Sequence, residues 1–234
     1  MTWALALAIL ALGLALGPWL DRLAEWSLRA PRSLRAPRSL RAPRSLRDPA
    51  TVDAAPWTRR SLVTGIIAGT FGAVAILLVP SLALAPAWVA LALVAAPIIR
   101  TDLARHRIPD VLNAIASVGG ALLLLVPGDL GAYGRAWLAA AAVTIALLGL
   151  ALIGPSGLGM GDVKLGPALG LYLGFLGWEP VLIGLAAGFV LGAVAGIAVL
   201  ARDVLARRPV RGALRRALPF GPFLLAGTLV GLAI

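Results

Sequence analysis

Two aspartates lie in short polar segments between apolar runs, and they are the residues best placed to do chemistry. Asp102 lies in the stretch PIIRTDLARHRIPDVLN, and Asp162 lies 60 residues later in GLGMGDVKLGPALG. A carboxylate at the end of a membrane span is costly unless it is paired or hydrated, so it is a candidate for function. Because both segments link apolar spans on the same side, the two aspartates can face one site.

The chemistry of such a pair is hydrolysis. Two carboxylates brought close together cannot both ionise at low cost, so they share one proton. One carboxylate can then activate water while the other polarises the carbonyl group of a peptide bond. Gly159 and Gly161 permit positive φ and remove side chains where an extended substrate would approach. The chain has no cysteine, which excludes a thiol nucleophile and a cysteine zinc site. We therefore expect peptide hydrolysis without metal or cofactor.

Each aspartate also has a simpler interpretation. Asp162 could cap the start of a helix by accepting its free backbone N–H groups. Asp102 could be a solvated loop carboxylate paired with Arg100 or Arg105, which would contribute little to stability. The catalytic interpretation is favoured for both residues.

Four neighbours of the pair are weighed separately. Asp110 follows Pro109, and both suit the first turn of a helix, so a structural role is favoured; Asp110 is nevertheless the substitute if Asp102 has no catalytic role. Lys164, the only lysine, could tune Asp162 or contact a lipid phosphate or a substrate charge. His106, the only histidine, has no second metal ligand nearby and is interpreted as a solvated loop residue.

The elements that position these residues are apolar spans. The 234 residues are 60% hydrophobic and 13% charged, and the mean hydropathy of +0.95 is far above that of a soluble domain. This composition predicts an all-α, polytopic membrane helix bundle of about eight transmembrane helices. The apolar segments lie near 3–20, 61–79, 82–99, 111–127, 137–154, 165–178, 181–200 and 219–234.

The basic residues predict the orientation of the bundle. Of the 21 basic residues, 20 fall in the segments 21–60, 100–109, 155–164 and 201–218, which are alternate links between spans. Cytoplasmic loops hold an excess of positive charge, so these links and both aspartates are expected at the cytoplasmic face, with both termini outside. The first run, 3–20, has no basic residue before it and is interpreted as a retained helix.

The first polar segment contains a short tandem repeat, in which SLRAPR occurs three times from Ser27 to Arg44. Proline in every unit interrupts a helix and the arginines repel one another, so an extended or disordered segment near anionic lipid headgroups is expected. The net charge is +11, but the basic residues lie in short segments between apolar runs. No separate polar domain presents them, so no nucleic-acid partner is expected.

Three motifs, at 101–113, 159–165 and 218–227, resemble those of the type IV prepilin peptidases and follow one another in the same order. GMGDVKL at 159–165 resembles the GxGD motif of that family. TDLARHRIPDVLN at 101–113 resembles its aspartate-bearing segment before the fourth span, and LPFGPFLLAG at 218–227 resembles the opening of its last span. The similarity runs from about residue 60 to the end.

The resemblance implies an intramembrane aspartic endopeptidase with Asp102 and Asp162 as the catalytic pair. It implies cleavage of the leader from type IV prepilin-like precursors with a basic leader and an apolar helix, in the cytoplasmic (inner) membrane. Residues 61–234 would form the peptidase domain, after a first helix and an Arg-rich loop in 1–60. Residues near the pair would support the site or contact substrate: Gly159, Gly161, Lys164, Asp110 and Pro109.

One departure from the family bears on a second activity. Bifunctional members carry paired CxxC motifs in a large first cytoplasmic domain and also methylate the new pilin N-terminus, whereas this chain has no cysteine. A peptidase without N-methylation is therefore expected. The alternatives are a bifunctional peptidase and N-methyltransferase, a proton-coupled small transporter, and a non-catalytic assembly factor.

Overall fold

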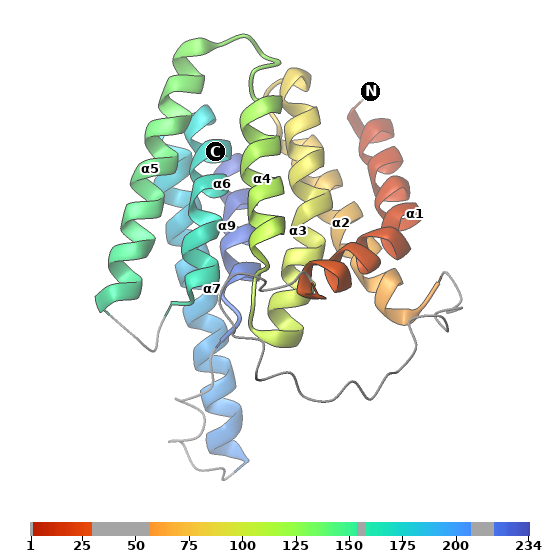
Figure 1. Ribbon diagram of the computed structural model, residues 1–234, viewed down its shortest axis with the longest axis vertical. Helices are drawn as coiled ribbons and strands as arrows, with labels where there is room; N and C mark the ends of the chain where they lie inside the picture. The colour runs from red at the N-terminus through yellow and green to blue at the C-terminus, as the bar shows by residue number, and fades with distance from the viewer. Residues whose placement is uncertain (1, 30–56, 154–157, 207–217) are drawn as a thin grey trace, which may run out of the picture.

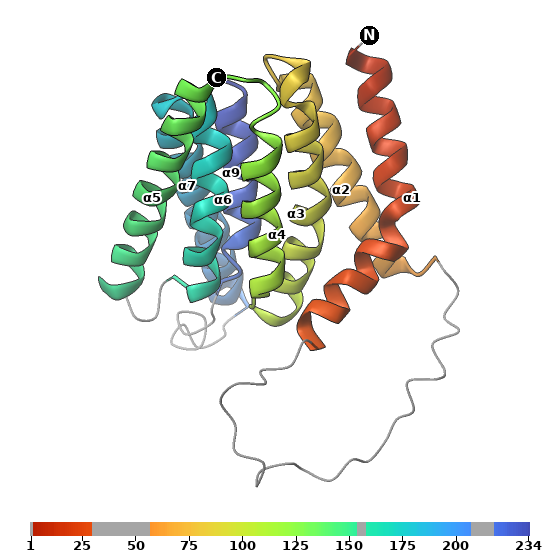
Figure 2. The same cartoon turned by 45° about the horizontal axis from the view of Figure 1, so that its top comes forward.

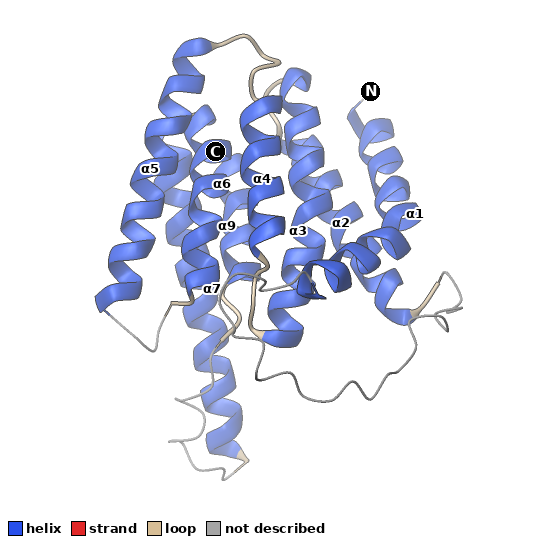
Figure 3. Ribbon diagram, viewed as in Figure 1, coloured by secondary structure: helices blue, strands red, loops and turns tan. Residues whose placement is uncertain are grey.

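The computed structural model describes residues 2–29, 57–153, 158–206 and 218–234, and this part of the chain is almost entirely helical (Figure 3). No strand occurs among the residues described. The all-α prediction is thus confirmed. The α-helices are α1 (Thr2–Arg29), α2 (Arg59–Leu78), α3 (Ala85–Arg105), α4 (Asp110–Leu123), α5 (Leu130–Ile153), α6 (Met160–Leu176), α7 (Trp178–Leu205) and α9 (Gly221–Leu232), and the 3-10 helix η2 (Leu82–Leu84) precedes α3.

These helices follow the order of the predicted spans, but they differ in length. Five described segments are long and apolar enough to cross a membrane, namely α1, α2, η2 with α3, α5 and α7. The apolar helices α4 and α9 have 14 and 12 residues, and α6 has 17. The protein is therefore a multi-pass membrane helix bundle, in which α4, α6 and α9 are short for a hydrocarbon core of about 30 Å.

Several helices extend beyond the apolar run that predicted them. α1 continues to Arg29, so Asp21 and Glu25 lie in a helix, and the prediction that the link between spans begins at residue 21 was wrong. α3 continues to Arg105 and α6 begins at Met160, so Asp102 and Asp162 lie inside the terminal turns of helices, not in the links. An apolar run ends at its first charged residue, whereas a helical backbone tolerates charged side chains near its ends. The repeat segment beyond Arg29 lies outside the described residues.

Glycine-lined contacts hold three helix pairs together. On α1, Gly13 and Gly17 lie against the backbone of α2, where a Cβ atom on either would overlap main-chain atoms. Gly170 of α6 lies in the same way against Ala140 of α5, and Gly227 of α9 lies against α7. Small residues let helices approach closely in a membrane, where burial from water gives no driving force between helices.

The elements that carry the two aspartates meet at one end of the bundle. Figures 1 and 2 place α1 and α5 at opposite edges, with α3, α4, α6 and α9 between them. The main core lies among these inner helices, where Trp88 of α3 packs edge-to-face on Tyr172 of α6 with ring centroids 5.5 Å apart. The last turn of α3 and the first turns of α6 and α9 lie at the end of the bundle opposite the two chain termini (Figure 1).

Candidate active site

Asp102 is buried in the last turn of α3 and is held by the first residue of α9. The residue is only 5% exposed. The Gly221 N–H donates a hydrogen bond to Asp102 Oδ2 at 3.0 Å. The free N–H groups and the helix dipole at the start of α9 both favour a negative charge at this position. The contact joins residues that lie 119 positions apart in the chain.

Gly221 has little space for any larger residue. A Cβ atom at this position would lie 2.9 Å from Ile108 Cδ1 and 3.0 Å from Asp102 Oδ2. Such contacts are shorter than van der Waals separation, so a side chain there would displace the carboxylate or Ile108. Glycine at 221 therefore allows the backbone donor to approach Asp102.

Asp162 is the third residue of α6 and is held in a similar way by a local backbone group. The Gly159 N–H donates to Asp162 Oδ2 at 3.2 Å, and Gly159 is the residue that caps the helix. Asp162 thus accepts a free backbone N–H at the start of α6, as the simpler interpretation expected, but it does so from the third helical position while Gly159 is the N-cap residue. The residue is 6% exposed, and Asp162 Oδ1 is buried without a hydrogen-bond partner in the described part of the chain. Leaving a buried carboxylate oxygen without a hydrogen bond costs free energy. Asp162 Oδ1 can therefore accept a hydrogen bond from water or from a substrate.

Both aspartates line one cavity of about 450 Å³. The cavity is formed by the end of α3, the link to α4, and the first turn of α6. Its lining residues are Asp102, His106, Arg107, Ile108, Asp110, Gly159, Met160, Gly161, Asp162 and Lys164. The structure therefore brings together the two carboxylates and four of the five neighbouring residues singled out in the sequence; the fifth, Pro109, caps α4 beside them.

Contacts between α4 and α6 hold the rim of this cavity. Lys164 Nζ pairs with Asp110 Oδ1 at 2.6 Å, and both side chains are exposed, at 48% and 74%. Deeper in the wall, Asn113 Nδ2 donates to the Gly161 carbonyl at 3.3 Å. A Cβ atom on Gly161 would lie 3.2 Å from Ile108 Cβ, so the start of α6 packs closely on the α3–α4 link. Lys164 thus has Asp110, not Asp162, as its ion-pair partner.

Asp102 makes no ion pair with Arg100 in the structure. Arg100 instead pairs with Asp21 and Glu25 of α1, and its Nη1 also donates to the Asp21 carbonyl at 2.9 Å. Residues two positions apart on an α-helix point about 200° apart, so Arg100 and Asp102 face opposite sides of α3. The solvated-loop interpretation of Asp102 was therefore wrong.

His106 ends α3 in the left-handed conformation, with φ 50°, and its N–H donates to the Asp102 carbonyl at 2.7 Å. Its side chain is exposed at the edge of the cavity. Within the described ranges, no group of three or more His, Cys, Asp or Glu side chains is arranged to hold a metal ion. The cavity thus offers carboxylates, backbone N–H groups and one exposed imidazole.

Sequence reasoning missed one residue of the site. The Pro-Phe-Gly-Pro-Phe motif at 219–223 was noticed only as a likeness, and the role of Gly221 as the donor to Asp102 was not predicted. The available signal was a glycine placed directly before the proline of a first helical turn, where backbone N–H groups are free.

The comparisons with known proteins agree with these motifs. Residues 87–197 match the model of the type IV leader peptidase family. The matched segment contains both Asp102 and Asp162, and it ends before the motif that contains Gly221. No curated protein and no solved structure matches the chain. This segment of the membrane helix bundle is therefore similar to the type IV leader peptidases.

Proposed function

We propose that the protein is an aspartic endopeptidase that uses Asp102 and Asp162 to remove the leader from type IV prepilin-like precursors. One observation carries the proposal: two buried carboxylates from α3 and α6 line the same cavity, and each accepts a hydrogen bond from a glycine N–H. The unpartnered Oδ1 of Asp162 gives this cavity an acceptor that no described group satisfies.

The two carboxylates share one proton because two negative charges close together in a poorly hydrated site are costly. The ionised carboxylate takes a proton from water as the water oxygen bonds to the carbonyl carbon of the scissile amide. The protonated carboxylate donates its proton to the carbonyl oxygen. Transfer of a proton to the amide nitrogen then accompanies cleavage of the C–N bond. The glycine N–H groups hold one oxygen of each carboxylate and so limit their rotation.

The position of the cavity suits a substrate with an apolar helix and a basic leader. The cavity lies at one end of a membrane bundle, so the substrate helix can lie in the bilayer beside it while the leader stays at the headgroups. Gly159 and Gly161 line the cavity at the start of α6, and Gly161 lets the α3–α4 link pack closely there. Asp110 and Lys164 form the rim, with Pro109 beside them at the start of α4, and these residues support the site or contact the leader.

The proposed orientation puts the cavity at the cytoplasmic face of the inner membrane and both termini outside. Its support is the distribution of basic residues, of which 20 of 21 fall in the sequence segments 21–60, 100–109, 155–164 and 201–218. The Arg-rich segment would then lie near anionic headgroups of the same leaflet. We further propose that the protein does not methylate pilin, because it has no cysteine and so lacks the CxxC pairs of bifunctional members.

Co-expression with a prepilin tests the catalytic pair. Asp102→Ala and Asp162→Ala are each expected to leave the precursor uncut, while Glu179→Gln at the start of α7, at the other end of the bundle, leaves processing normal. Normal processing by either aspartate variant would remove the assignment and would favour the transporter or the assembly factor. Incubation of the purified enzyme with S-adenosylmethionine and a cleaved pilin tests methylation, and methyl transfer would support the bifunctional alternative.

The absence of native cysteine makes the orientation directly testable. Met160→Cys lies at the cavity and Ile234→Cys at the other end of the bundle, and both native residues are exposed, at 58% and 63%. In intact cells, a thiol reagent that does not cross the membrane is expected to label Ile234→Cys and spare Met160→Cys. The opposite pattern would reverse the proposed orientation without affecting the pairing of the aspartates.

A further inference from the structure

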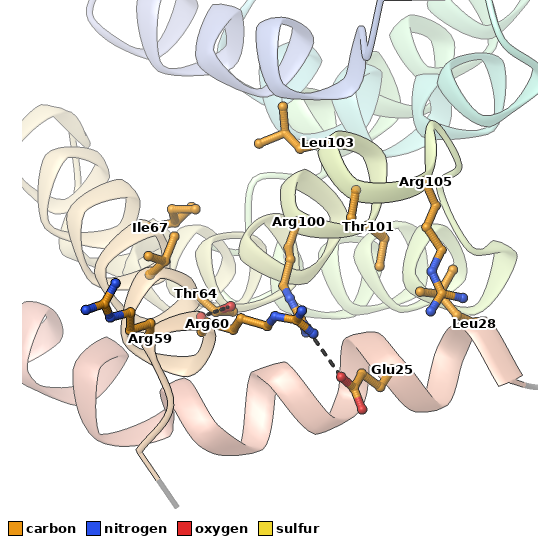
Figure 4. Close-up of a pocket in the computed structure, with 12 residues that line it drawn as sticks. Glu25, Leu28, Arg59, Arg60, Thr64, Ile67, Arg100, Thr101, Leu103 and Arg105 are labelled. Atoms are coloured by element: carbon orange, nitrogen blue, oxygen red, sulfur yellow. Dashed lines mark hydrogen bonds and ion pairs between the residues drawn. The ribbon is translucent and has the colours of Figure 1, made fainter. Parts of the chain in front are cut away.

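A second cavity lies on the other side of α3, at the same end of the bundle. It has a volume of about 630 Å³ and lies between α1, α2 and the last two turns of α3 (Figure 4). Four arginines contribute to its lining: Arg59 and Arg60 from the start of α2, and Arg100 and Arg105 from α3. Glu25 of α1 is the one acidic residue in that lining.

The positive charge of this cavity is only partly compensated. Arg100 pairs with Asp21 and Glu25, as Figure 4 shows for the second contact. No ion pair among the described residues involves Arg59, Arg60 or Arg105, and all three residues are exposed. Three arginines around one cavity repel one another unless an anion lies between them. The guanidinium group suits a phosphate because it donates two parallel hydrogen bonds.

The remainder of the cavity lining is largely apolar. Val63 and Ile67 follow the arginines along α2, and Leu28 and Leu103 line it from α1 and α3. Val63 and Leu103 are each 56% exposed on helices that span the membrane, so a lipid chain can contact them. A ligand that fits this lining has an anionic head at the arginines and an apolar chain along the α2 wall.

We propose that this cavity binds an anionic phospholipid, with its phosphate at Arg59, Arg60 and Arg105 and an acyl chain along Val63 and Ile67. Basic pockets between membrane helices are suited to phosphate headgroups, and the apolar lining favours a lipid over a free phosphate. The proposed site is distinct from the cavity of the aspartates, because its lining comes from the opposite face of α3. It does not depend on the proposed peptidase activity.

Binding can be measured on the purified full-length protein without any activity assay. The protein is reconstituted in nanodiscs of phosphatidylcholine with a minor fraction of phosphatidylglycerol, released, and weighed by native mass spectrometry. The wild type is expected to retain phosphatidylglycerol in preference to phosphatidylcholine. Removal of one arginine by Arg59→Gln, Arg60→Gln or Arg105→Gln is expected to weaken retention about fivefold, and the triple variant about 100-fold.

Two further variants separate the cavity from general surface charge. Arg202→Gln removes a charge from α7, outside the cavity, and is expected to leave retention unchanged. Val63→Trp keeps all the arginines but fills the apolar wall, and it is expected to reduce retention about tenfold. Equal retention by the triple variant and the wild type would overturn the proposal, as would unchanged retention by Val63→Trp. Displacement of the lipid by glycerol phosphate at the same concentration would identify a site for soluble phosphate and would also overturn it.

Discussion

The last two turns of α3 separate two cavities that use charge in different ways. On the α6 side, Asp102 and Asp162 are buried, and each is held by one backbone N–H group. On the α1 side, Arg59, Arg60 and Arg105 are exposed, and among the described residues of that lining only Arg100 is held by ion pairs. The end of α3 thus presents a preorganised carboxylate to one cavity and, with the start of α2, exposed cations to the other.

The two cavities are therefore suited to different tasks. Buried, oriented carboxylates suit a reaction that needs atoms in defined positions, because preorganisation lowers the barrier of the chemical step. Exposed cations are well hydrated and mobile, so they suit attraction of a charged partner more than chemistry. The variants below test this contrast.

The largest effect is expected from removing one of the buried carboxylates. Asp102→Asn keeps the shape of the side chain and an acceptor for the Gly221 N–H, but it cannot take part in proton sharing. We expect kcat for cleavage of a prepilin by the purified enzyme to fall about 10²- to 10⁴-fold. Arg59→Gln in the other cavity is the matched change of charge, and we expect it to alter kcat by less than about twofold. Similar losses from both variants would remove the contrast between the cavities.

The next effect concerns the backbone donor to Asp102. Gly221→Ala places a Cβ atom 3.0 Å from Asp102 Oδ2 and 2.9 Å from Ile108 Cδ1, so the carboxylate or the link must shift. A misplacement of about 1 Å can lower the rate about 100-fold, and we expect a loss of this size in kcat with little change in KM. Gly119→Ala is the control, because a Cβ atom there has no neighbour within 4 Å. If the two variants are equally active, the Gly221 contact does not orient the carboxylate.

A smaller effect is expected for the one arginine that is held in place. Arg100→Gln removes the ion pairs to α1, where the Arg100 and Asp21 side chains are only 18% and 15% exposed. We expect the free energy of unfolding in detergent to fall by about 1.5–3 kcal/mol, since a partly buried carboxylate loses its partner. A double-mutant cycle with Asp21→Asn measures the coupling, and a coupling energy near zero would show that the pair does not stabilise the α1–α3 contact.

The smallest effect is expected at the rim of the aspartate cavity. Lys164 and Asp110 form an exposed ion pair, and such pairs contribute about 0.2–1 kcal/mol at low salt. Lys164→Gln and Asp110→Asn should therefore change stability by less than about 1 kcal/mol, and the change should shrink as salt is raised. A change in kcat/KM above about tenfold in either variant would instead indicate direct contact with substrate.

Much of the fold follows from composition and hydropathy. The order of the helices and their membrane character were predicted, because each apolar run needs a helix to satisfy its backbone groups in lipid. The helix ends were less predictable, because polar residues such as Asp21 and Glu25 can continue a helix when a partner such as Arg100 lies on a neighbouring one. Arg100 is more than 70 positions away in the sequence, so no local pattern reveals this contact.

The candidate site was likewise predictable only in part from the sequence. The two aspartates were selected from residue type and position, and the structure brings both to one cavity. The opposite directions of Arg100 and Asp102 follow from helical periodicity once α3 is known to continue to Arg105. The Gly221 contact was not predictable, because it depends on how α9 packs against α3.

The Gly221–Asp102 hydrogen bond has a consequence for the order of events during synthesis. Asp102 leaves the ribosome long before Gly221, so during translation its carboxylate lacks the backbone donor that orients it. If Asp102 is catalytic as proposed, a nascent chain that has inserted α1 to α7 is still without a competent peptidase. Activity would then begin only when α9 inserts, after the helices that carry both aspartates are already in the membrane.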